Sequence, residues 1–186
     1  MARAVLISGY TATEFGIFTA EHPGIPAILH CLSERISSLA AEGVEWFVIS
    51  GQQGTELWAA QAVFALREKA QLPLRLAFLP PFLDQDSHYR PWLQTLYAEI
   101  RDQADFYRPI SNRPYESPLQ LKQKDQFLVA HTEGLLLIYD EKREGSPRYL
   151  LSAAEKKAAG GHYSIMRIDG NDLETAAEDL RWQHLY

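Results

Sequence analysis

Short apolar runs alternate with helical patterns along this whole chain. The first run, Ala4 to Ser8, is stopped by Gly9 and lacks the polar alternation of a strand with one solvated face. Such a run is typical of a strand that is covered on both faces of a parallel sheet. Further strand candidates follow at residues 46–49, 74–79, 104–107, 135–139 and 163–168. The alternation predicts an α/β sandwich of three layers, doubly wound on a mainly parallel sheet.

Helical patterns fill the intervals between the apolar runs. Pro26 is expected to open the first helix, which ends near Glu42 and carries Cys31 as a small core residue. Trp58, in the second helix, is likewise assigned to the core. Helices are expected at residues 26–42, 56–71, from 91 onward, 119–131 and 148–159, with a short terminal helix capped by Asn171 and Asp172. No repeat or linker divides the 186 residues, so we expect one domain, residues 1–186.

Charge and cysteine content restrict the function classes. The net charge of −6 repels a polyanion, so only weak, salt-sensitive binding of nucleic acid is expected. No run of about 18 apolar residues is present, and no membrane span is predicted. Cys31 is the only cysteine, which excludes a disulfide within these residues. Because a strand-like run begins directly after the first residues, no signal peptide is expected, and the cytoplasm is the expected compartment.

The stretch from Trp46 to Trp58 is the strongest candidate for a ligand site. Its pattern predicts a strand, a tight loop with Gly51 and Gly54, and a helix that starts at Glu56. Backbone N–H groups and the positive end of the helix dipole favour an anion there, and glycine lets a phosphate approach the backbone. The alternative is that both glycines only permit a tight turn. Glu56 has two interpretations as well, as a helix cap or as an acceptor for a ribose hydroxyl.

Other candidate residues follow the ends of other strands. In open parallel sheets a ligand binds beyond the carboxyl ends of the strands, where the strand order reverses. Those segments are Gly9–Tyr10, residues 80–90, residues 111–117 and residues 140–146. Arg113 could clamp a phosphate and Tyr115 could stack on a base, whereas the alternative for Arg113 is an ion pair with Glu116. Lys122 and Lys124 are assigned to a solvated helix face.

Several chemistries lack their sequence signature. The six histidines show no paired spacing with cysteine or acidic residues, so no metal site is expected. No Gly-x-Ser-x-Gly elbow is present, and the sequence places no base beside Ser50. The Gly-x-x-Gly-x-Glu loop is neither the Gly-x-Gly-x-x-Gly dinucleotide fingerprint nor a P-loop. NAD dehydrogenases of the fingerprint type and P-loop ATPases are therefore both disfavoured.

Motifs spread over nearly the whole chain resemble one known family. The motifs are Val5–Tyr10 with Glu14–Phe18, Gly43–Trp58, Asn112–Gln120, and Tyr139–Asp140 with Glu144–Pro147 and Ala154–Lys156. Together they resemble the YpsA family of the SLOG superfamily, which also holds the DNA-processing protein DprA and the LOG phosphoribohydrolases. The resemblance implies a Rossmann-like fold and a pocket for a nucleotide or a nucleotide-derived ligand such as NAD or ADP-ribose. It also implies a bacterial protein, with relatives linked to cell division and stress responses.

The loop departs from that of the LOG enzymes, whose motif is Pro-Gly-Gly-x-Gly-Thr-x-x-Glu with a catalytic final glutamate. Ser50 stands for the proline, Gln52 for the second glycine, and Trp58 where the glutamate would fall. These departures weaken the hydrolase hypothesis. The DprA loop has the closer spacing, but the acidic chain lacks that protein's additional domain, which weakens single-strand binding.

The leading hypothesis is a nucleotide-ligand-binding protein that acts as a sensor. The second is an enzyme that cleaves an N-glycosidic bond, with Glu56 as the candidate acid or base. The third is an interaction module with a partner in division-site assembly. Relatives often pair, so a homo-oligomer is also expected. The candidate ligand-binding residues are Gly9, Tyr10, Ser50, Gly51, Gln52, Gln53, Gly54, Thr55, Glu56, Arg113, Tyr115, Ser117, Tyr139, Asp140 and Ser146.

Overall fold

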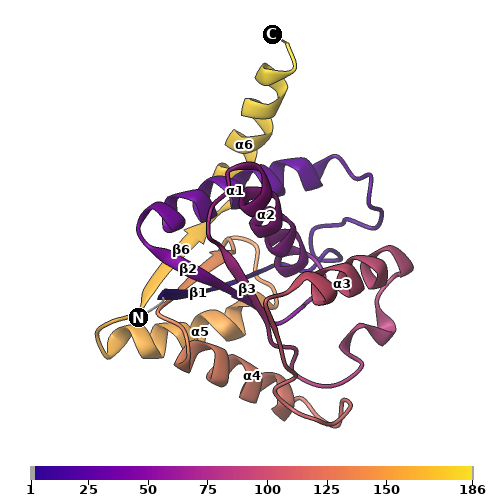
Figure 1. Ribbon diagram of the computed structural model, residues 1–186, viewed down its shortest axis with the longest axis vertical. Coiled ribbons are helices and arrows are strands. Elements are labelled where there is room, and N and C mark those ends of the chain that lie inside the picture. The colour runs from indigo at the N-terminus through magenta and orange to yellow at the C-terminus, as the bar shows by residue number, and fades with distance from the viewer. Residues whose placement is uncertain (1–2, 186) are drawn as a thin grey trace.

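The computed structural model describes residues 3–185 and shows a Rossmann-like α/β sandwich (Figure 1). Within these residues a single sheet of six strands is parallel throughout, in the order β4-β3-β2-β1-β5-β6. The expected fold class is thereby confirmed. The strands are β1 Arg3–Gly9, β2 Val44–Ile49, β3 Arg75–Phe78, β4 Phe106–Tyr107, β5 Gly134–Ile138 and β6 Ser164–Ile168.

Helices cover both faces of the sheet (Figure 1). One layer contains α1, α2, α3 and α6, where α1 packs against α2 and α6, and α2 packs against α3. The other layer contains α4 and α5, which pack against each other. The helices are α1 Gly24–Ala41, α2 Thr55–Lys69, α3 Pro91–Gln103, α4 Leu119–Ala130, α5 Pro147–Ala159 and α6 Gly170–Gln183, with a 3₁₀ turn, η1, at Gln85–His88.

The strand order reverses beside β1. The chain builds outward from β1 through β2 and β3 to β4, and α4 then carries it back to β5 on the other side of β1. The last residue of β1, Gly9, lies opposite Ile138, the last residue of β5. Along the chain, α4 follows β4 and α5 follows β5. Because the strands of this sheet are parallel, both helices begin at the edge where the strands end. A ligand site is expected at this edge, between β1 and β5.

The core forms from the apolar runs that predicted the strands. Every residue of β5 is buried, and so are the last five residues of β1. Trp58 is 1% exposed and Cys31 is buried, which confirms both core assignments. Each fully buried large apolar side chain contributes about 1.5–3 kcal/mol to folding.

The first helix begins earlier than expected. It starts at Gly24, so Pro26 lies at its third position rather than at its start. Proline is tolerated there because the N–H groups of the first helical turn have no partner within the helix.

The terminal helix also differs from its expected form. Its cap is Asp169, whose carboxylate accepts the Asp172 N–H at 3.0 Å, while the Asp172 carboxylate accepts the Asp169 N–H at 2.9 Å. The predicted cap at Asn171 and Asp172 was therefore wrong, because Asp172 is the returning partner of a capping box. The helix is 14 residues long and buries only Ala176, and its end projects from the body of the molecule (Figure 1).

None of the helices in residues 3–185 is long and apolar enough to cross a membrane.

Candidate functional site

The two glycines of the β2–α2 loop are both required by the local packing. Gly51 and Gly54 have φ values of +80° and +115°, which side chains rarely adopt. A Cβ on Gly51 would collide with the ring of Phe78. A Cβ on Gly54 would collide with the backbone of Thr11–Ala12. The fold alone therefore gives a reason for both glycines, with or without a phosphate.

The β1–α1 connection holds this loop from one side. The Thr55 N–H donates to the Tyr10 carbonyl oxygen at 3.2 Å, and the Thr55 hydroxyl donates to the same oxygen at 2.8 Å. The Ala12 N–H donates to the Gln53 carbonyl oxygen at 3.2 Å. The first backbone donor of α2 thus already has a partner inside the chain, so a phosphate would need donors further along the turn.

Tyr89 holds the loop from the other side. Its hydroxyl donates to the Gly51 carbonyl oxygen at 3.0 Å. Burial of the ring raises the pKa of the Tyr89 phenol, so the hydroxyl stays protonated as a donor. Residues 80–90 were named only as one of the segments that follow a strand, and Tyr89 was not predicted to anchor the loop.

Glu56 lies at the centre of the site and is 2% exposed. Its Oε1 accepts the Ser50 N–H at 2.6 Å and the Ser50 hydroxyl at 2.8 Å, and its Oε2 accepts the Ser8 hydroxyl at 3.0 Å. Burial raises the pKa of Glu56, opposed by the charge of Lys124 and by the hydrogen bonds from Ser50 and Ser8. The carboxylate ties the first turn of α2 to the ends of β1 and β2.

Tyr10 fastens the β5–α5 connection to β1. Its hydroxyl accepts the Asp140 N–H at 2.9 Å and lies 2.5 Å from the Arg143 carbonyl oxygen, to which it can donate. Burial raises the pKa of the Tyr10 phenol. The Asp140 carboxylate accepts backbone N–H groups of Lys142 and Gly170, and these bonds lower its pKa. Tyr10 and Asp140 thus lie together, as expected for residues at the ends of β1 and β5. Their contacts hold the β5–α5 connection in its conformation.

The N-terminus of α5 is occupied by a carboxylate of the chain itself. Glu14 accepts the Ser146 N–H at 2.7 Å, the Ser146 hydroxyl at 2.6 Å and the Thr11 N–H at 2.9 Å. Gly145 leaves room for this carboxylate, because a Cβ there would collide with it. Burial by itself would raise the pKa of Glu14, but the hydrogen bonds from Ser146 and Thr11 outweigh it and hold the pKa below its ordinary value.

A cavity of about 1130 Å³ lies between α4 and α5 and reaches the sheet at Ser8 and the loop at Gln52. One end of the cavity is lined by Pro118 and Pro147, where the two helices begin. Most of its wall is apolar, as is usual for small-molecule sites. Its charged lining residues are Lys122, Lys124, Asp125, Lys156 and Lys157. Four lysines against one acid make the cavity positive, although the chain carries a net charge of −6.

Comparison with known proteins gives the same family as the motifs. The YpsA family model, described as the YspA SLOG family, matches residues 5–173. The chain belongs to the YpsA family. The chain is 42% identical over 179 residues to a UPF0398 protein of Lysinibacillus sphaericus, covering 96% of this chain and 99% of the relative. It is 39% identical over 177 residues to the UPF0398 protein YpsA of Bacillus subtilis, covering 95% and 98%.

A UPF0398 protein of Brevibacillus brevis is 40% identical over 186 residues, covering all of this chain and 98% of that protein. The region matched by the YpsA family model runs from the first strand into α6. It therefore includes the glycine loop and both helices that form the cavity.

Of the fifteen candidate ligand-binding residues of this YpsA-family chain, only Gln52 and Ser146 line the cavity. Arg113, Tyr115 and Ser117 lie in the segment that precedes α4. The Arg113 side chain is 73% exposed and lies 3.8 Å from the Glu116 carboxylate, the ion pair named as its alternative role. Tyr115 is half exposed, with its ring edge-on to Phe82. Ser117 donates its N–H to the Gln120 side chain. This segment meets the cavity only at the next residue, Pro118.

The sequence assigned both α4 lysines to a solvated face, and for Lys124 this was wrong. Its side chain is 12% exposed, because it packs into the cavity wall beside Asp125. Lys122 is exposed as expected. The apolar residues of α4 do not gather on one face of the helix, and Leu121 and Phe127 are exposed. This pattern indicates a helix that faces an open groove rather than only solvent and core.

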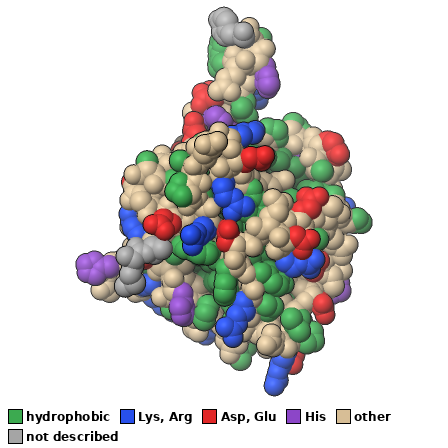
Figure 2. Space-filling model, in the orientation of Figure 1, with side chains coloured by type: hydrophobic (Ala, Val, Ile, Leu, Met, Phe, Trp, Pro, Cys, Tyr) green, Lys and Arg blue, Asp and Glu red, His purple; other side chains and the backbone are tan. Residues whose placement is uncertain are grey.

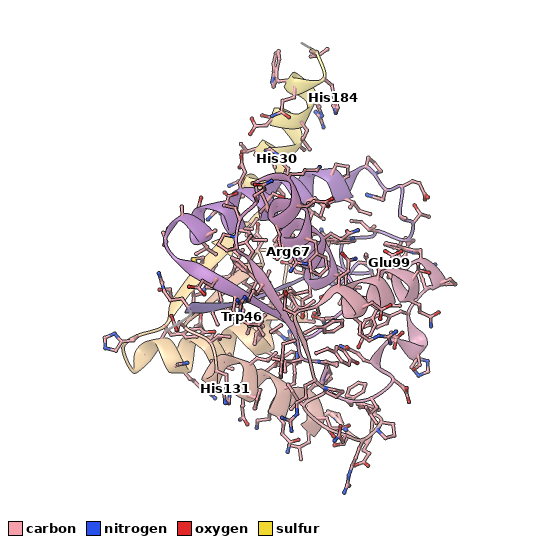
Figure 3. The ribbon with its side chains drawn as sticks, in the orientation of Figure 1. His30, Trp46, Arg67, Glu99, His131 and His184 are labelled. Carbon is pink, nitrogen blue, oxygen red and sulfur yellow. The ribbon has the colours of Figure 1, made fainter. Side chains whose placement is uncertain are left out.

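No group of three or more potential metal ligands gathers in residues 3–185. Figure 3 shows three of the histidines, His30, His131 and His184, on α1, after α4 and after α6, without convergence. Figure 2 shows acidic and basic side chains interspersed over the visible face.

The contacts of Glu14 predict an acid-sensitive contribution to stability. Because its pKa is lower in the folded chain than the ordinary value of 4.5, its stabilising effect is full above that value and is lost as the pH falls through the folded pKa. We expect urea unfolding to show wild type more stable than Glu14→Gln at about pH 7, with the gap narrowing as the pH falls below 4.5. Glu21→Gln, an exposed acid of the same connection, should show no such trend. A gap independent of pH would contradict the role of the charge.

Proposed function

We propose that the chain binds a nucleotide or a nucleotide-derived anionic ligand, of the NAD or ADP-ribose type, in the cavity between α4 and α5. The observation that carries this proposal is the positive cavity between α4 and α5, one end of which reaches the reversal of strand order. It opens between Ser8 at the end of β1 and Ser146 at the start of α5. Ligands of open α/β sheets bind at this place in the fold.

The composition of the wall supports the same ligand class. Leu121, Val129 and Leu150 offer apolar surface for a base. Lys122 and Lys156 come from opposite helices and are both exposed to solvent at the cavity. Lys157 has a different role, because its ammonium donates to the carbonyl oxygens of Val129 and Thr132 at 2.7 Å each and so caps α4. Two cations thus remain to meet phosphate groups.

The competing N-glycosidase hypothesis receives less support. An acid or base catalyst must reach the substrate within hydrogen-bond distance. The Glu56 carboxylate is instead bonded to Ser50 and Ser8, and only Ser8 lines the cavity. Trp58, which is buried in the core, holds the position of the catalytic glutamate of the LOG enzymes. We therefore favour binding over hydrolysis.

Thermal unfolding with AMP, ADP-ribose and NAD tests the proposed function. A ligand at about 100 times its dissociation constant stabilises the folded chain by roughly 2.7 kcal/mol. For a domain of this size, the melting temperature should rise by about 5 °C or more. We expect such a rise for wild type with at least one of the three ligands, and its loss in Lys122→Met and Lys156→Met.

Lys69→Met is the matched control, because Lys69 is an exposed lysine at the end of α2, in the opposite helix layer. It should leave the ligand effect intact. If none of the three ligands moves the wild-type melting temperature, the proposal loses its support. If the cavity variants respond like wild type, the ligand binds elsewhere.

A further inference from the structure

The end of α6, residues 181–185, carries apolar side chains that the body of the molecule does not cover. Trp182 is 61% exposed and Leu185 is 71% exposed, and they lie three residues apart. Helix α6 packs against α1 around the buried Ala176, whereas its end projects from the molecule (Figure 1). Figure 3 shows His184 on this projecting end. Exposed apolar side chains that lie together are typical of an interaction surface.

A groove between α1, α2 and α3 has no role in the proposed ligand site. Its volume is about 620 Å³, and it lies in the helix layer on the other side of the sheet from the α4–α5 cavity. Leu29, Phe64 and Leu96 give it apolar walls, one from each of the three helices. An apolar groove between helices can receive an apolar segment of helix.

The charges of the groove and of the α6 end are complementary. Arg181 forms no ion pair within the described part of the chain, and neither do Glu68 and Glu99 on the groove. The groove also contains Lys69 and His30, and His30 already lies 3.4 Å from an acid of its own helix. Two acids against one lysine make the groove negative, while the α6 end is positive. The two surfaces therefore attract each other.

We propose that the α6 end inserts into the α1–α2–α3 groove of a second copy of this chain, and that the second copy makes the same contact in return. Trp182 then lies against the apolar walls, and Arg181 faces Glu68 and Glu99. Two identical contacts close a two-fold dimer, the commonest symmetry of soluble oligomers. Tryptophan and arginine are the side chains that most often dominate such contacts. This contact supplies a surface for the homo-oligomer that the family resemblance leads us to expect, and it does not depend on the nucleotide site.

A membrane surface is a less suitable occupant for the α6 end. Helices that lie on membranes carry lysine and arginine on their polar face. Helix α6 instead carries Asp172, Glu174, Glu178 and Asp179, which an anionic lipid surface repels. The groove of a second copy offers apolar walls together with acids that attract Arg181.

Sedimentation equilibrium of the full chain tests the contact. We expect wild type to be a dimer at micromolar concentration. Trp182→Ala removes the apolar anchor, and Ala65→Lys fills the groove from a half-buried position on α2 and repels Arg181. Each variant should raise the dimer dissociation constant at least about 100-fold, because each change is made at both contacts of the dimer. Phe106→Ala, which removes an exposed aromatic ring on β4, should leave the dissociation constant unchanged.

An equal mixture of the two variants separates this contact from other ways of pairing. The Trp182→Ala chain keeps a normal groove and the Ala65→Lys chain keeps a normal α6 end, so one intact contact can form between them. We expect the mixture to dimerise at a concentration at which each variant alone is a monomer. Since only folded chains can form this contact, loss of the fold cannot imitate the result. If Ala65→Lys does not fold, Glu99→Lys takes its place, because it reverses a charge at an exposed position of the groove.

Three results would overturn the proposed contact. The first is a wild-type chain that stays a monomer at high micromolar concentration. The second is a groove variant that dimerises like wild type, since the α6 ends would then pair with each other or the dimer would form elsewhere. The third is a mixture that stays monomeric although circular dichroism shows that both variants are folded.

Discussion

Replacing Glu56 with alanine is expected to destabilise the fold by about 3–5 kcal/mol, because each buried polar group left without a partner costs about 1–3 kcal/mol. The Ser50 N–H and the hydroxyls of Ser50 and Ser8 would lose their common acceptor, and a cavity would open below the loop. The relief of one buried charge offsets part of this cost. Urea unfolding measures the difference directly.

Glu56→Gln is the control for this prediction. It keeps the size of the side chain and one acceptor oxygen, so we expect a cost of only about 1–2 kcal/mol. Because burial raises the pKa of Glu56 above 4.5, the protonated form is favoured in the folded chain, and wild type should gain on the glutamine variant as the pH falls through the folded pKa. That trend is opposite to the one for Glu14. An alanine variant within 1 kcal/mol of wild type would show that the carboxylate does not hold the loop.

Gly54→Ala is expected to cost more than about 3 kcal/mol, because the strain of an unfavourable backbone conformation adds to a steric collision. With φ at +115° and ψ at −122°, Gly54 has a conformation that L side chains rarely adopt. Its Cβ would also lie against the main chain of Thr11 and Ala12, which cannot turn aside as a side chain could. We expect a melting temperature at least about 6 °C below that of wild type.

Gly161 provides the matched control, since its φ is +120° and an added Cβ would meet nothing within 4 Å. Gly161→Ala therefore carries the backbone strain alone, at about 1–2 kcal/mol. The difference between the two variants measures the collision in the loop. Equal costs would mean that the β1–α1 connection moves aside, and that the loop is less rigid than its contacts indicate.

The fold was predictable because local patterns and global architecture agree. Continuous apolar runs such as residues 135–138 become strands that are buried on both faces, and the helices between them make the sheet parallel. The errors lie at the starts of helices, where the position of the first helical residue depends on which of two or three neighbouring side chains acts as the cap. The capping box of Asp169 and Asp172 shows this, because either aspartate fits a cap by residue type alone.

The candidate site was predictable only in part. Segments that directly follow strands were predicted to lie close together, and Tyr10, the glycine loop and the β5–α5 connection do so. The order of residues does not show which donor is hydrogen-bonded to which acceptor. The bonds from Ser146 to Glu14 and from Ser50 to Glu56 were therefore not predicted. These pairings leave fewer free donors at the helix ends than the motif suggests.

The basic side of the cavity was missed for a different reason. Lys122 and Lys124 lie on a helix whose periodicity is weak, and a lysine on such a helix is usually solvated. Only the packing of α4 against α5 makes a wall of these side chains. The same packing places Asp125 among the lysines. The weak pattern of α4 indicates a groove, but it does not show which charged side chains form the groove's wall.

The proposed ligand site between α4 and α5 can be located by recording the amide NMR spectrum of wild type during titration with ADP-ribose. We expect shifts for Ser8, Gln52 and Ser146 and along the facing sides of α4 and α5. A second groove between α1, α2 and α3, lined by Leu29, Phe64 and Leu96, should remain unchanged. Shifts confined to that second groove, or no shifts at millimolar ADP-ribose, would contradict a nucleotide site between α4 and α5.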